Sequence, residues 1–256
     1  MPLGRVKMAN HTQEPSPLFY ARAAGFLYLI IIVFGIYGEM FVRSGLIVPG
    51  NPTETASNIM ASQGLFRVGF LADSIMFLSD IALAVLLYTL LKPVSQIAAL
   101  MAMCFRLAQT TVIALNLLHY HAAMLLLNGS GYSAAFGTNQ LSALAAFFLD
   151  LHGHGYDLGL LLFGLHCLLL GYLIFKSGYL PKTLGVLIVA SGFTYLIGSY
   201  TRFLFPEYVA AVSPIYIVAI VSELSLCLWL LMKGVSLQQW ERMMQEFPST
   251  DKLRLI

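Results

Sequence analysis

The sequence predicts an all-α protein in which a bundle of six transmembrane helices crosses a membrane. Composition supports this fold class first, because 59% of the 256 residues are hydrophobic and only 10% are charged. Soluble domains carry about 25% charged residues, and so few charges could not cover a soluble domain of this length. The mean hydropathy of +0.80 agrees. The second observation is the presence of six long apolar runs.

Each run reaches the length of about 20 residues that a helix needs to cross a bilayer. The connections LKPVS and KSGYLPK are short, and the other connections are rich in proline, glycine and asparagine. Residues 140–151 are expected to extend the fourth span as a helix that breaks or bends near the GHG of residues 153–155. The predicted spans are Tyr20–Phe41, Leu65–Leu91, Val94–Leu118, Tyr156–Phe175, Leu184–Leu204 and Val212–Met232.

The spans form one predicted membrane domain, residues 20–233, between two polar segments. Residues 1–19 lack the apolar core of a cleavable signal peptide. In the tail, residues 234–256, an apolar stripe predicts an amphipathic helix lying on the inner membrane surface, with a solvated tail as the alternative. The stripe consists of Leu237, Trp240, Met244 and Phe247.

The basic residues predict the orientation of the bundle, since cytoplasmic loops are enriched in Lys and Arg. Placing both termini in the cytoplasm leaves only Arg43, Arg67 and Arg202 outside and Arg106 within a span. The other 10 of the 14 basic residues are then cytoplasmic: Arg5, Lys7, Arg22, Lys92, Lys176, Lys182, Lys233, Arg242, Lys252 and Arg254.

Four ionisable residues are predicted to share one level near the bilayer centre. A helix rises 1.5 Å per residue, which places Asp80, Arg106, His166 and Glu223 roughly 15 to 20 Å from the inner boundary. Unpaired charges at that depth are costly, so we expect a buried ion pair between Asp80 and Arg106. The layer would hold a ligand or relay protons; the alternative is a purely structural role.

A second polar group lies further out, and it suggests a metal site. Asp73 and Asn116 are expected there as ligand-binding residues. The side chains of His119, Asp150, His154 and Asp157 are types that bind zinc or a similar divalent ion, and on a continuous helix the last three share a face. No known motif such as HExxH supports this prediction. The alternative is a set of hydrogen-bonded interfacial residues.

Three functions are compatible with these patterns. The first is a non-enzymatic module that binds a lipid or small ligand in an outward-facing polar cavity. The second is a metal-dependent hydrolase or lipid-modifying enzyme that uses the outer His and Asp residues. The third is a small proton-coupled transporter, although the internal repeats of many transporters are not apparent. Membrane lipids are the expected partners, and a net charge of +2 is too small to suggest nucleic acid.

Three stretches resemble a known family: LYTLLKPVSQ, FRLAQTTVIALNLL and FGLHCLLLGYLIFKSGYLPKTLGVLIVASGFTYLIGS. They are similar to the bacterial multi-spanning membrane family of unknown function called DUF4386. The likeness covers most of the chain, and the block joining the fourth and fifth spans is its most specific part. It implies a multi-pass protein of the bacterial cytoplasmic membrane, with Asp80, Arg106, His166 and the KSGYLP turn in the family pattern. It implies no activity.

Overall fold

The computed structural model describes residues 16–129, 131 and 135–246, and these residues form helices and connections with no strand. The long helices are α1 (Pro17–Ile36), α4 (Gln63–Leu91), α5 (Gln96–Leu127), α6 (Thr138–Ser177), α7 (Lys182–Leu204) and α9 (Tyr216–Met232). The shorter ones are the π-helix η1 (Tyr37–Arg43), α2 (Ser44–Leu46), α3 (Pro52–Ala61), η2 (Pro206–Tyr208), α8 (Val209–Val212), η3 (Ser213–Ile215) and α10 (Leu237–Glu246).

The predicted fold class is confirmed, because six helical segments are long and apolar enough to cross a membrane. The protein is therefore a multi-pass membrane protein. The segments are Pro17–Leu46, Gln63–Leu91, Gln96–Leu127, Thr138–Ser177, Lys182–Leu204 and Pro206–Met232. The third and fourth are longer than the predicted spans, since α5 continues to Leu127 and α6 begins at Thr138.

The expected break near the GHG of residues 153–155 is wrong, because α6 runs without interruption for 40 residues. Its glycines serve close packing instead. A Cβ atom at Gly155 would lie 2.2 Å from Oδ1 of Asn116, and one at Gly153 would lie 2.9 Å from Nη2 of Arg202. These two positions therefore admit polar side chains from α5 and α7 against the backbone of α6.

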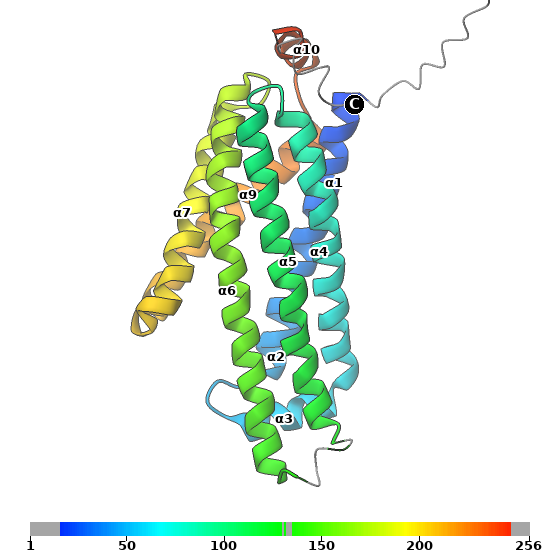
Figure 1. The fold of residues 1–256 in the computed structure, drawn as a ribbon, viewed down its shortest axis with the longest axis vertical. Coiled ribbons are helices and arrows are strands. Elements are labelled where there is room, and N and C mark those ends of the chain that lie inside the picture. Colours follow the sequence, from blue (N-terminus) through cyan, green and yellow to red (C-terminus); the bar gives the residue numbers. More distant parts are fainter. Residues whose placement is uncertain (1–15, 130, 132–134, 247–256) are drawn as a thin grey trace, which may run out of the picture.

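The six spans form a closed ring, in which each packs against the next in the order α1, α4, α5, α6, α7, α9 and back to α1. Helix α10 lies at one end of the ring and α3 at the other (Figure 1). We call these the α10 end and the α3 end. Helix α7 and the outer part of α9 diverge from the long axis toward the α3 end (Figure 1).

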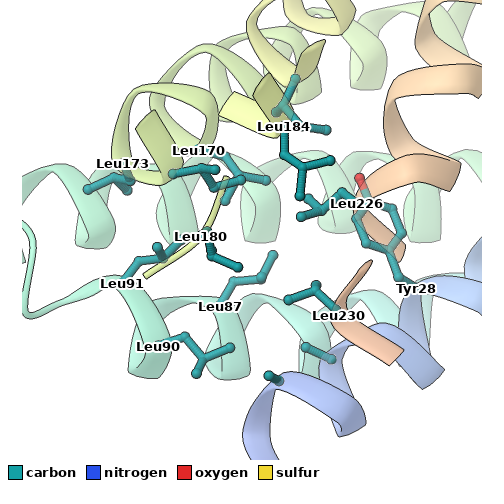
Figure 2. Close-up of a cluster of buried hydrophobic side chains, with 14 of the residues drawn as sticks. Tyr28, Leu87, Leu90, Leu91, Leu170, Leu173, Leu180, Leu184, Leu226 and Leu230 are labelled. Atoms are coloured by element: carbon teal, nitrogen blue, oxygen red, sulfur yellow. The ribbon is translucent and has the colours of Figure 1, made fainter. Parts of the chain in front are cut away.

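The main hydrophobic core fills the α10 end of the ring. Leucines from α4, α6 and α9 pack together there, and Tyr28 of α1 lies at the edge of the cluster beside Leu226 (Figure 2). The KSGYLPK turn closes this core, because the Tyr179 hydroxyl donates to the Leu90 carbonyl at 2.6 Å. The turn itself is permitted by Gly178, whose φ of 71° is left-handed. The ends of α4 and α6 are thereby fixed to each other.

The tail contributes α10 to the same end. Trp240 and Met243 pack against the core, and the Trp240 indole N–H donates to the Leu90 carbonyl at 3.3 Å. Phe247 of the predicted stripe lies outside the described residues, as do residues 1–15 of the N-terminal segment. Helix α10 is thus attached to the bundle through Trp240 and Met243.

Candidate functional site

Arg106 is the centre of the inner polar layer, and its side chain is completely buried. Its Nε donates to Oδ1 of Asp80 at 2.8 Å, and its Nη2 donates to the same oxygen. The second Asp80 oxygen accepts from the Thr110 hydroxyl at 2.8 Å. The rings of Tyr28 and Phe163 lie beside the guanidinium, with centroids 5.4 and 5.1 Å from its carbon. Every charge in this cluster therefore has a partner.

His166 completes the cluster as a neutral imidazole. Its Nδ1 lies 2.8 Å from the Ala102 carbonyl oxygen, which can only accept, so Nδ1 carries the proton. Its Nε2 lies 2.9 Å from Nη1 of Arg106 and accepts from it. Both ring nitrogens are occupied, so His166 positions Arg106.

Glu223 lies on α9 and forms no hydrogen bond with Asp80, Arg106 or His166. Its side chain is buried, and its Oε1 accepts hydrogen bonds from the hydroxyls of Tyr195 and, at 3.3 Å, Ser191. Among the described residues, no basic side chain forms an ion pair with Glu223. It is a buried carboxyl group with hydroxyl partners alone.

A cavity of about 170 Å³ is lined by Glu223 and by Asp80 and Arg106, and all six spans contribute to its wall. Its polar wall consists of Asp80, Arg106, Gln109, Tyr156, Tyr195 and Glu223. Its apolar wall consists of Ile31, Ile32, Gly35, Ile36, Met76, Phe77, Leu160, Phe163 and Ile220. The cavity thus combines fixed polar groups with a largely apolar lining, as small-molecule sites commonly do.

The cavity reaches the side of the ring. Ile36 of α1 and Ile220 of α9 both line it, and their side chains are 38% and 49% exposed. The sequence predicted an outward-facing polar cavity, and the direction stays a prediction. This cavity lies at the inner polar layer, with an edge between α1 and α9.

A second polar layer lies nearer the α3 end, around Arg43 of the π-helix. Arg43 donates from Nε to Glu39 at 2.7 Å and from Nη1 to Asp73 at 2.8 Å. Asn116 donates to the His152 carbonyl at 2.7 Å, and the His152 Nδ1 lies 3.2 Å from the Asn116 carbonyl. Asp73 and Asn116 therefore belong to this outer layer and do not line the cavity.

Sequence reasoning treated Arg43 only as a marker of orientation. Glu39 and Arg43 are oppositely charged, lie four residues apart and end an apolar run. This spacing is the sequence signal that Arg43 belongs to a polar cluster. Gln109, Tyr156 and Tyr195 were likewise not assigned to a site. They are ordinary residues on polar helix faces, and only the closure of the ring brings them to one cavity.

The four predicted metal ligands are not brought together. His119 contacts Oδ1 of Asn116 at 2.9 Å, and exposed His154 contacts the backbone carbonyl of Asp150 at 2.8 Å. Asp157 forms an ion pair with Arg202 at 2.9 Å. Within the described part of the chain, no three His, Cys, Asp or Glu side chains form a group that could hold a metal ion. His119 and Asp157 instead contact other side chains, and His154 and Asp150 meet only through the backbone carbonyl of Asp150.

Comparison with known proteins assigns the chain to a family. The model of the family described as "Domain of unknown function (DUF4386)" matches residues 23–234. The chain belongs to the DUF4386 family. The match runs from α1 to the residue after Lys233 and so includes all six spans, which confirms the family expected from the sequence.

A curated relative of this DUF4386 protein is an uncharacterized protein from Archaeoglobus fulgidus. It is 31% identical over 160 residues, which are 62% of this chain and 80% of the relative. No solved structure matches the chain. Neither description carries an activity, so a function has to be inferred from the cavity itself.

Proposed function

We propose that this DUF4386 protein binds a small amphipathic ligand, which it takes from the lipid phase into the cavity at the centre of the helix ring. One observation carries the proposal: the buried carboxyl group of Glu223 lines a cavity whose walls are otherwise mostly apolar. Buried polar groups without full partners are expensive, and a ligand head group would supply the missing contacts.

The size of the cavity limits the ligand. Its volume of about 170 Å³ is below the roughly 300 to 1,000 Å³ of typical ligand pockets. A whole phospholipid would not fit, whereas a head group with a short apolar chain would. The edge formed by Ile36 and Ile220 suits entry of such a molecule from the lipid side.

The two alternative functions gain less support. A metal-dependent hydrolase needs converging ligands, and the outer His and Asp residues have other partners. A proton relay through Asp80 and His166 would have to break the hydrogen bonds that hold Arg106. The binding function uses the cavity without disturbing either network.

The test compares wild-type protein with Leu160→Trp, which fills the cavity, and with Leu158→Trp, a control on the exposed face of the same helix. Small molecules that co-purify in mild detergent would be identified by mass spectrometry. We expect the wild type and the control to retain one amphiphile that Leu160→Trp loses. Gly35→Val narrows the same cavity from α1 and should act in the same direction. Identical contents in all four proteins would contradict the proposal.

We also propose that the α10 end faces the cytoplasm of a bacterial cell and that the protein resides in its cytoplasmic membrane. The support is the position of Lys92, Lys176, Lys182 and Lys233 at the helix ends and connections of this end.

Single cysteines at the exposed positions Ser57 in α3 and Gln239 in α10 test the orientation. In intact cells, a membrane-impermeant maleimide should label Ser57→Cys and should reach Gln239→Cys only after the cells are opened. The reverse pattern would show that the bundle is inserted the other way round.

A further inference from the structure

We infer that the ligand is a small lipophilic amine, with its ammonium group bound at Glu223. This inference rests on the proposed function and specifies the chemical class of the ligand. It depends on the charges around the cavity, on the free oxygen of Glu223 and on the aromatic rings in the cavity wall.

Of the three ionisable side chains that line the cavity, Asp80 and Arg106 pair with each other and Glu223 has no basic partner among the described residues. Asp80 and Arg106 form an ion pair in which two guanidinium nitrogens donate to one carboxylate oxygen. Glu223 is the remaining charged side chain in the lining, and its partners are the hydroxyls of Tyr195 and Ser191. An ionised carboxylate in an apolar site is stabilised by a nearby cation. A cationic ligand would therefore supply the basic partner that Glu223 lacks.

The geometry of Glu223 leaves one oxygen for such a ligand. Both hydroxyls donate to Oε1, and no hydrogen bond to Oε2 among the described residues meets the geometric limits, although the buried Tyr28 hydroxyl lies near the Glu223 carboxyl group. Four side-chain atoms of the described residues are fully enclosed and have no hydrogen-bond partner: Tyr28 Oη, Asp73 Oδ1, His152 Nε2 and Ser199 Oγ. Oε2 of Glu223 is not one of them. Oε2 is thus not fully enclosed, and the cavity is the space that Glu223 lines.

The aromatic wall favours the same class of ligand. Phe77, Tyr156 and Tyr195 line the cavity, and aromatic ring faces attract a cation within about 6 Å. An anionic amphiphile would instead bring a second negative charge next to Glu223. The isoleucines of α1 and α9 provide the apolar surface for the alkyl chain. Carboxylate, rings and apolar wall together match a short alkylamine.

The experiment compares three probes with the same chain length, hexylamine, hexanol and hexanoate, on the full-length protein in detergent. Binding would be measured by calorimetric titration and by the shift in thermal unfolding temperature. We expect hexylamine to bind about tenfold or more tightly than hexanol, as one added charge interaction would give, and hexanoate not to bind. Equal binding of the three probes would overturn the amine inference and leave the proposed function in place, whereas failure of all three would overturn both.

Two variants locate the effect. Glu223→Gln should remove the preference for hexylamine and keep the binding of hexanol. Glu207→Gln is the matched control, since it makes the same chemical change at an exposed position outside the cavity, and it should keep the preference. A preference that survives in Glu223→Gln would overturn the inference. If that variant does not fold, the comparison of the three probes on the wild type decides alone.

Discussion

Arg106 has no solvent exposure, and Asp80 supplies the carboxylate that compensates its charge. Asp80→Asn should therefore lower the free energy of unfolding by about 3 to 5 kcal/mol, because it leaves a buried cation without its partner. Thermal or denaturant unfolding in detergent would measure the loss.

The double variant Asp80→Asn with Arg106→Gln removes both charges and should recover part of that stability. A double variant whose loss equals the sum of the two single losses would mean that the two side chains do not interact.

Counting residues from the inner ends of the helices predicted much of the inner polar layer. Asp80, Arg106 and His166 were placed at one level by the rise per residue alone, and the structure joins them by hydrogen bonds. The outer residues were less predictable. Spacing in sequence cannot show that His119 contacts Asn116, or that Asp157 contacts Arg202 on another helix.

At the scale of elements, α6 and α7 touch through their backbones. A Cβ atom at Gly171 would lie 2.6 Å from the Gly185 carbonyl oxygen, closer than real contacts allow. Gly171→Ala should therefore lower the free energy of unfolding by about 1 to 3 kcal/mol, as overpacking does. Scanning calorimetry in detergent would measure the change.

Gly64→Ala in α4 is the matched control, because open space surrounds its Cβ position. It should leave the stability unchanged or raise it through helix propensity. An equal loss at Gly64 would mean that the change at Gly171 acts through something other than the contact with α7.

The number of spans was predictable because each helix has to expose an apolar surface of bilayer length. The ends of α5 and α6 were not, because both continue beyond that length and are held by packing against each other and against α3. The π-helix Tyr37–Arg43 was also missed. A π-helix differs from an α-helix in having backbone hydrogen bonds between residues five apart instead of four. The hydropathy of the side chains does not depend on that difference.

At the scale of the whole molecule, the cavity exists because six helices close into a ring while α1 and α9 leave exposed side chains at its edge. No single segment of sequence contains this feature. Its lining residues come from positions as far apart as Ile31 and Glu223. The sequence could therefore suggest polar residues for a site, but it could not locate the cavity among them or the direction in which it opens.

The most direct measurement of the central claim is photolabelling with a diazirine-bearing hexylamine in native membranes, followed by peptide mass spectrometry. The account predicts label on residues 31–36 of α1 and around Ile220 of α9, which excess hexylamine removes. Leu158 and Leu165 face away as exposed residues of α6 and give the background level. Label of equal intensity at those lipid-facing positions, unaffected by competitor, would contradict a binding site in the ring.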